Sequence, residues 1–168
     1  MSGAPGGLLA LDLSTRVGWA YGADFSAPAH GIWELSGGGT SLGARCSALA
    51  ERLEDAIAVL QPGLVILEAP LPPKAQTAMN SARIQFGLAA VAEMICEEQH
   101  VRVEEEKADT VRGFILGRAR PQKPEIVAWC KAQGWSPVDH NDGDALMLWR
   151  YRHILGRSRV MAGAGSAG

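Results

Sequence analysis

Several features that define common protein classes are missing from this sequence. No apolar run approaches the roughly 20 residues that a membrane-spanning helix needs. The N-terminal residues MSGAPGG lack the basic stretch and the long apolar core of a secretory signal. The three cysteines, Cys46, Cys96 and Cys130, include no CxxC spacing, and each lies in an apolar pattern typical of a helix. We therefore expect a cytoplasmic protein with buried thiols and no membrane partner.

Positive charge is not in excess either. The 16 lysines and arginines stand against 18 aspartates and glutamates, so the net charge of −2 does not by itself indicate a nucleic-acid partner. The distribution is uneven, however, because five basic residues and one acid lie between Arg112 and Lys131. From Arg150 onward there are four arginines and no acid, whereas the acids concentrate in 51–55, 93–106 and 139–144. We therefore expect a polarised surface.

The length of 168 residues fits one domain with a sizeable core. We assign residues 1–158 to that domain and the small-residue segment 159–168 to a flexible C-terminal tail. Apolar periodicity predicts strands over 8–14, 17–23, 30–35, 64–68 and 101–104, and helices over about 41–60, 77–99, 108–116, 125–133 and 145–155. This order of elements predicts an α/β fold with a mixed sheet and helices on its faces.

Acidic residues end or follow the apolar pattern at three places. Asp12 follows the apolar run 8–11, and Glu68 follows 64–67, which is apolar at every position, as in a strand buried on both faces. The polar cluster 139–144 opens the last expected helix. An unpaired buried carboxylate costs several kcal/mol, so acids at these positions need partners. The simplest alternative is that Asp12 is a chance strand-end residue whose carboxylate accepts from backbone N–H groups.

Convergence of these acids would form a metal site. Two hard divalent cations about 3.5–4 Å apart need oxygen ligands from different chain segments. Such a pair of ions stabilises both the attacking water and the leaving oxygen in phosphodiester cleavage. The carboxylates would repel one another without a cation, which favours two Mg²⁺ or Mn²⁺ ions in the site.

With these motifs in this order, the sequence resembles the RuvC-type Holliday junction resolvases of the ribonuclease H-like superfamily. The motifs are DLSTRVGW at 12–19, ILEAP at 66–70 and DGDALMLW at 142–149. The resemblance covers residues 8–155 and is closer to the phage-type branch, whose last motif has the form D-x-N-[ED]-[AG]-D-A, here 139–145. It implies one ribonuclease H-like nuclease domain, with a five-stranded mixed sheet whose first three strands are antiparallel, flanked by helices.

The resemblance also implies roles for individual residues. Asp12, Glu68 and Asp144 would hold the two metal ions and form the catalytic centre. The family tends to have two lysines eleven residues apart near the scissile phosphate, where this sequence has Arg112 and Lys123. Lys123 would stabilise the charge that develops in the transition state. Arg112 is a departure from the family pattern.

The fourth metal ligand stays open. The family usually has Asp or His three residues before the final Asp, where this sequence has Asn141, a weaker oxygen donor. Asp139 lies before the expected helix, so its side chain is able to reach the metal site. Asp142 would point away from the metal site if the helix has already begun. Asp139 or Asn141 could instead cap the helix, with the other acids complementing its dipole. The candidates are therefore Asn141, Asp139 and Asp142.

DNA binding and dimerisation are also implied. The expected DNA-binding residues are Lys74, Arg83, Arg112, Arg118, Arg120 and Lys123. The helix over 77–99 carries a stripe of small residues that permits close helix approach, namely Ala78, Ser81, Ala82 and Ala89. In the family this helix forms the dimer contact, so we expect a homodimer, which suits a junction with two strands to cut.

The remaining histidines and tryptophans are expected to have no part in the site. His30, His100 and His153 are scattered without the spacing of metal ligands. We expect Trp33, Trp129, Trp135 and Trp149 in the core or in partner contacts.

The expected function is cleavage of phosphodiester bonds in four-way junctions and related branched DNA by a two-metal-ion mechanism. An alternative is a catalytically weak or silent branched-DNA binding protein of the same fold, which Asn141 would allow. A third interpretation is an ATP-binding protein related to actin, which requires a glycine-rich phosphate hairpin. The first turn here, Leu13–Arg16, has no glycine, and the chain is too short for two such lobes, so this interpretation is disfavoured.

Overall fold

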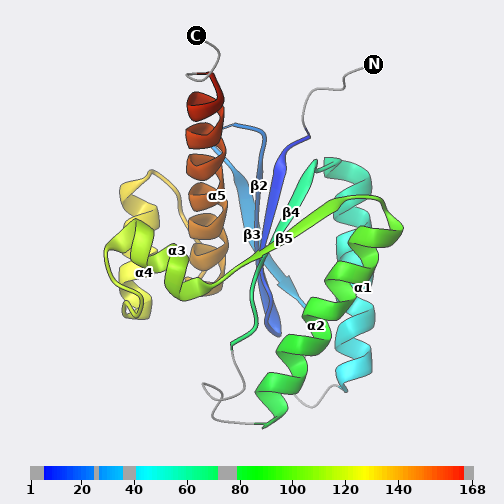
Figure 1. Cartoon of the computed structure of the whole chain (residues 1–168). Coiled ribbons are helices and arrows are strands. Elements are labelled where there is room, and N and C mark those ends of the chain that lie inside the picture. The colour runs from blue at the N-terminus through cyan, green and yellow to red at the C-terminus, as the bar shows by residue number, and fades with distance from the viewer. Residues whose placement is uncertain (1–5, 25–26, 36–40, 72–78, 165–168) are drawn as a thin grey trace.

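In the computed structural model, the chain forms a five-stranded sheet with helices on both faces (Figure 1). The structure describes residues 6–24, 27–35, 41–71 and 79–164, without the side chains of 79 and 157–164. The elements are β1 (Leu8–Asp12), β2 (Arg16–Gly22), β3 (Ala29–Glu34), α1 (Leu42–Leu60), β4 (Leu64–Glu68), α2 (Met79–Glu98), β5 (Arg102–Glu106), α3 (Ala108–Leu116), α4 (Lys123–Ala132) and α5 (His140–Ala164).

The strand order in the sheet is β3-β2-β1-β4-β5. β1, β2 and β3 pair antiparallel, whereas β4 runs parallel to β1 and β5 parallel to β4. The expected mixed sheet with three antiparallel first strands is therefore confirmed. All residues of the central strand β1 are buried, because helices cover both of its faces.

Side chains alternate between two cores along β1 and β4. Leu9, Leu11, Val65 and Leu67 pack in the core that includes the buried residues of α1 and α2. Leu8, Ala10 and Ile66 pack in the core that includes the buried residues of α3, α4 and α5. Asp12 and Glu68 continue the second series, so their carboxylates lie on the α5 side of the sheet. This alternation gives the two acids a common face.

Helix α5 is longer than the sequence predicted. It begins at His140 instead of about residue 145, and it ends at Ala164 instead of about residue 155. Residues 145–149 are at most 1% exposed, because α5 lies between the sheet and helices α3 and α4. The polar cluster forms the first turns of the helix because the Asp139 carboxylate caps it. The helix includes residues 159–164 of the expected tail, and residues 165–168 lie outside the described residues.

The cysteines are free thiols. Cys96 and Cys130 are fully buried, as expected, and burial raises the pKa of their thiols to about 11 and about 12. Cys46 is only half-buried. None of the helices in the described parts of the chain is long and apolar enough to cross a membrane.

Two glycines allow the first turns of α5 to pack closely. Gly18 pairs with Asp12 across β1 and β2, and a Cβ atom on Gly18 would lie 2.0 Å from the carbonyl oxygen of Asn141. A Cβ atom on Gly143 would lie 2.8 Å from Cγ2 of Ile126 on α4. Any larger residue at position 18 would push the start of α5, and with it Asp144, away from Asp12.

We therefore expect Gly18→Ala to destabilise the protein by about 1–3 kcal/mol, because the added methyl group overlaps backbone atoms. Urea denaturation followed by circular dichroism measures this change. The matched control is Gly113→Ala on α3, where a Cβ atom would meet nothing within 4 Å. That control should gain up to about 1 kcal/mol from helix propensity. An unchanged urea midpoint for Gly18→Ala would contradict the close packing.

Candidate functional site

Three carboxylates lie at the end of the sheet where β1 and β4 finish. Leu11 pairs with Leu67 in the parallel ladder, so Asp12 and Glu68 are the next residues on two adjacent strands. Asp144 comes from the second turn of α5, which packs over β1 and β4. Asp12 is 8% exposed and Asp144 is 5% exposed. The fold therefore brings together the three acids that the sequence predicted as metal ligands.

The three acids disfavour one another's ionisation. Burial raises the pKa of Asp12 well above its usual value, and the charges of Glu68 and Asp144 raise it further. Burial, followed by the charge of Asp144, raises the pKa of Glu68 to about 7. A site with these properties favours a bound cation, because a positive charge relieves both the repulsion and the loss of solvation.

A cation from the chain itself already lies in this site. The Arg112 guanidinium on α3 donates from Nε to Oδ1 of Asp144 at 3.0 Å and from Nη2 to Oδ2 at 2.9 Å. Burial alone would lower the pKa of Arg112, but the charges of Asp144, Glu68 and Asp12 raise it above its usual value. The predicted contact of Arg112 with DNA stays a prediction, and in this structure its guanidinium lies on the Asp144 carboxylate.

Asp139 caps α5 and forms an ion pair. Its Oδ1 accepts from the backbone N–H groups of Asn141 at 2.9 Å and Asp142 at 3.1 Å. Its Oδ2 accepts from Nη2 of Arg16 at 3.0 Å. Burial tends to raise the pKa of Asp139, but the Asp142 N–H and Arg16 hold it below its usual value. The capping interpretation of Asp139 is therefore confirmed.

Asp142 anchors the first turn of α5 to β3. Its side chain is fully buried, and Nδ1 of His30 lies 3.0 Å from Oδ1 and 2.9 Å from Oδ2 of this carboxylate. Oδ2 also accepts from the Val138 N–H at 2.8 Å. The contact of His30 was not expected from the sequence, because the two residues are 112 positions apart and His30 has no local signal.

One acid at the same edge of the sheet was missed by the sequence analysis. Glu106 pairs with Glu68 across β4 and β5. Its carboxylate accepts from the Tyr151 hydroxyl at 3.2 Å and from the Lys107 N–H at 2.9 Å. The predicted fifth strand ended at residue 104, and only the ladder register shows that Glu106 lies beside Glu68.

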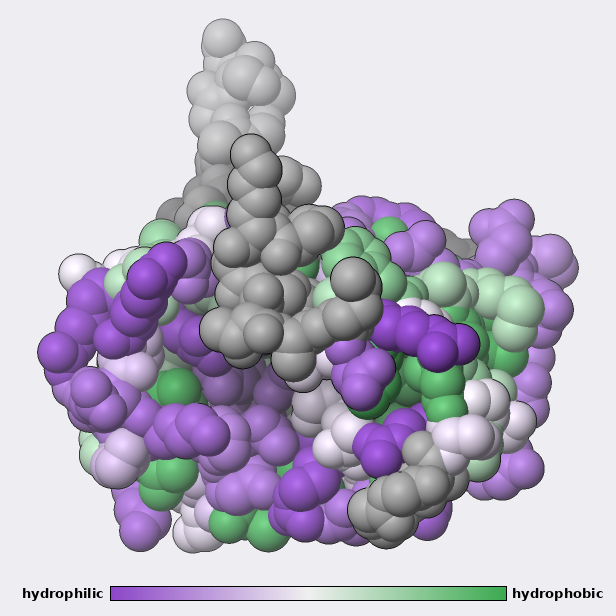
Figure 2. Space-filling model, turned by 90° about the horizontal axis from the view of Figure 1, so that it is seen from below, coloured by the Kyte–Doolittle hydropathy of each residue, from purple (hydrophilic) through white to green (hydrophobic). Residues whose placement is uncertain are grey.

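Of the expected DNA-binding residues, Arg83 lies on α2, whereas Arg112, Arg118, Arg120 and Lys123 lie on α3, in the loop after it and at the start of α4. Lys123 is exposed at the start of α4, and its charge, after those of Arg112 and His140, offsets part of the burial-raised pKa of Asp144. Arg118 forms an ion pair with Glu125. Arg120 and Arg83 are exposed, whereas Lys74 lies outside the described residues. In Figure 2, which shows the molecule from below, hydrophilic side chains predominate on the side of α3 and α4.

The carboxylates of the site are of the chemical type that binds a divalent metal ion, but their side chains are not arranged to hold one in this structure. Carboxylate oxygens are the ligands that Mg²⁺ and Mn²⁺ prefer. Among the residues that the structure describes, however, no three His, Cys, Asp or Glu side chains are grouped closely enough to hold an ion. In this arrangement both oxygens of the Asp144 carboxylate accept hydrogen bonds from the Arg112 guanidinium.

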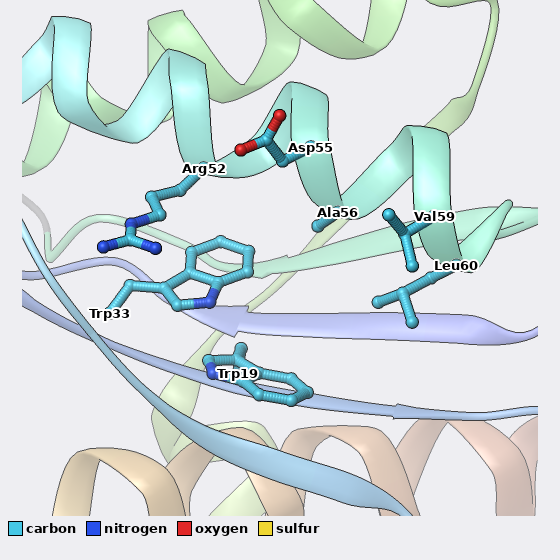
Figure 3. Close-up of a pocket in the computed structure, with 7 residues that line it drawn as sticks. All are labelled: Trp19, Trp33, Arg52, Asp55, Ala56, Val59 and Leu60. Atoms are coloured by element: carbon cyan, nitrogen blue, oxygen red, sulfur yellow. The ribbon is translucent and has the colours of Figure 1, made fainter.

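A separate hollow lies on the α1 side of the sheet (Figure 3). It is lined by Trp19, Trp33, Arg52, Asp55, Ala56, Val59 and Leu60. The rings of Trp19 and Trp33 stack there, with centroids 6.0 Å apart. It contains none of the acids at the strand ends, so we place the candidate site at the end of the sheet.

Trp149 is buried in the core on the α5 side, and Trp129 and Trp135, which are partly buried, pack against that core. Trp135 packs edge to face against Trp129 at 5.7 Å and against Trp149 at 5.9 Å between ring centroids. His153 packs against Trp149 at 4.4 Å, and its Nε2 lies 3.3 Å from the Gly22 carbonyl oxygen. These contacts are structural.

Neither a protein-family model nor a curated protein sequence matches the chain. Solved structures do match it. RuvC of Thermus thermophilus has a TM-score of 0.70 and 15% identity, covering 90% of this chain and 96% of that chain. The same protein in complex with a Holliday junction substrate has a TM-score of 0.73 and 13% identity, covering 91% and 96%. The yeast mitochondrial Holliday junction resolvase Ydc2 has a TM-score of 0.65 and 8% identity, covering 94% and 83%. The chain therefore has the fold of these nucleases, as the sequence resemblance implied.

Proposed function

We propose that this protein is a divalent-metal-dependent endonuclease that cleaves four-way junctions and related branched DNA. The observation that carries the proposal is the convergence of Asp12, Glu68 and Asp144 at one end of the sheet. The fold supports it, because solved structures with this fold include resolvases of four-way junctions. A cleavage assay on synthetic junctions, flaps and plain duplex, with and without Mg²⁺, tests it.

In this proposal, Asp12, Glu68 and Asp144 hold two Mg²⁺ or Mn²⁺ ions. When bound, the ions would supply a nucleophilic water and stabilise the leaving oxygen. The fourth ligand comes from Asn141, Asp139 or Asp142. Asp139 and Asp142 already hold Arg16 and His30, which favours Asn141. Lys123 stabilises the negative charge that develops on the scissile phosphate.

A second candidate function is branched-DNA binding with weak or no cleavage. Two observations favour it: Asn141 is a neutral donor, and Arg112 occupies both oxygens of Asp144. The cleavage assay distinguishes the two candidates. A catalytically inactive binding protein would bind four-way junctions but would not cut them at any Mg²⁺ or Mn²⁺ concentration.

We expect Asp12→Asn to abolish cleavage and to leave junction binding unchanged or tighter. The change removes a metal ligand and also relieves the repulsion between the carboxylate and DNA phosphates. Cleavage on denaturing gels and binding by fluorescence anisotropy in EDTA measure the two effects. Asp55→Asn on α1 is the matched control, since Asp55 lines the hollow on the far face of the sheet and should not affect cleavage. Cleavage by Asp12→Asn at the wild-type rate would refute the site.

Lys123 and Arg120 should differ in which step they affect. Lys123→Ala should lower the single-turnover cleavage rate by about 10²–10³-fold with little change in binding, because a donor to the transition-state charge is lost. Arg120→Ala should instead weaken binding and lower the salt slope by about one unit, as expected for a phosphate contact. A Lys123→Ala protein that cleaves normally once bound would place Lys123 in the general basic surface.

We also propose a homodimer formed through α2. Phe86 is 47% exposed and Met94 is 49% exposed, and both lie on one face of this helix, on either side of exposed Ala90. The stripe of small residues is a weaker basis for the dimer, since Ala89 is buried against the α1 core, and Ala78 lies outside the described residues. Apolar side chains at the surface on the α1 and α2 side of the molecule are visible in Figure 2.

Phe86→Glu should therefore convert the dimer to a monomer, because burying an unpaired carboxylate in an apolar contact is unfavourable. Sedimentation velocity at micromolar concentration measures the change. Val59→Glu is the matched control, because Val59 is 80% exposed on α1 and should not be part of the contact. A wild-type protein that sediments as a monomer even with junction DNA would rule out the dimer.

A further inference from the structure

The Arg112–Asp144 pair holds both oxygens of one expected metal ligand. The two donated bonds, at 3.0 and 2.9 Å, form a fork in which each guanidinium nitrogen meets a different carboxylate oxygen. The Asp144 side chain is 5% exposed and that of Arg112 is 23% exposed, so solvent weakens the pair little. The positive charge of Arg112 also lowers the pKa values of Asp12 and Glu68, against the larger effect of burial. Arg112 thus acts as the counter-ion of the whole carboxylate cluster.

A divalent ion and Arg112 make competing demands on this cluster. An ion bound to Asp144 would lie close to a guanidinium of the same sign of charge. Separating Arg112 from Asp144 without new partners would leave the buried Asp144 carboxylate and the partly buried Arg112 guanidinium unpaired, which is unfavourable. Release of Arg112 therefore requires both an ion for the carboxylate and an anion for the guanidinium.

A DNA phosphate is suited to take over Arg112. The planar guanidinium binds phosphate in the same two-bond geometry in which it binds carboxylate. A lysine at this position would hold Asp144 with a single compact charge and could not form the fork. The arginine therefore makes the exchange of carboxylate for phosphate possible with little loss of hydrogen bonding.

We propose that Arg112 gates the metal site. In the free protein it holds Asp144 away from divalent cations, and a DNA phosphate that binds Arg112 frees Asp144 for the metal. Metal and DNA then bind with positive coupling, and the coupling is the same whichever binds first. This inference rests on the proposed function, because it takes Asp144 as a metal ligand, and it assigns Arg112 a positioning role.

The test measures Mn²⁺ binding to the free protein by the electron paramagnetic resonance signal of unbound Mn²⁺. Arg112→Gln should bind Mn²⁺ about 5–150-fold more tightly than the wild type, the usual range for coupled sites. Arg112→Lys should lie between the two. Arg102→Gln is the matched control, since Arg102 is an exposed arginine paired with Glu104 on β5, and it should bind as the wild type does.

The second arm adds a four-way junction with uncleavable phosphorothioate linkages. The junction should raise the Mn²⁺ affinity of the wild type by a similar factor and leave that of Arg112→Gln nearly unchanged. Circular dichroism checks that each variant is folded. If Arg112→Gln does not fold, Arg112→Lys carries the test, and a Mn²⁺ affinity no higher than the wild type's then overturns the gate.

The outcomes separate this inference from the proposed function. If the wild type cuts junctions with Mn²⁺ and Arg112→Gln binds Mn²⁺ no more tightly than the wild type, the gate is wrong and the nuclease stands. If no variant binds Mn²⁺ and no junction is cut under any condition, both proposals fall. Tighter binding by Arg112→Gln that Asp144→Asn reverses in the double variant supports the gate.

Discussion

The close approach of the first turns of α5 to β1 and β2 is the constraint on which the site depends. Gly18 permits it, because any Cβ atom there would overlap the Asn141 carbonyl. The contacts of Asp139 with Arg16 and of Asp142 with His30 then fix the turn against β2 and β3. Two acids of the polar cluster therefore hold the helix in place, and this keeps Asp144 close enough to Asp12 and Glu68 for its charge to raise their pKa values.

Electrostatic repulsion is concentrated where the fold is best packed. Asp12 ends a strand that helices cover on both faces, and Asp144 precedes the most deeply buried part of α5. Burial raises the pKa values of both acids, and the charges of Glu68 and Asp144 raise that of Asp12 further, so the cluster costs stability whenever its acids are ionised without a cation. Arg112 offsets part of that cost in the free protein. Buried charges that lower the stability of the fold are common at functional sites.

The apolar runs predicted the five strands and placed Asp12 and Glu68 at the ends of two of them, whereas the antiparallel arrangement of the first three strands was implied by the family resemblance. It did not predict where α5 begins, because a polar cluster resembles a loop until Asp139 is known to cap it. The contacts Arg112–Asp144 and His30–Asp142 join residues 32 and 112 positions apart and leave no local pattern. Likewise, helical spacing predicts that Ala89 lies on one face of α2, but it does not predict that this face packs against α1.

In the proposed function, the Arg112–Asp144 pair would help a chain with a net charge of −2 to bring DNA to an acidic site. Three ionised carboxylates alone would repel the phosphate backbone at the point where it must approach. Arg112 neutralises one of them from within the fold, and Lys123 adds a positive charge at the start of α4. The local charge presented to DNA is therefore much less negative than the acids suggest. In the proposed gate, the contact that withholds Asp144 from a metal in the free protein is also the contact that a DNA phosphate replaces.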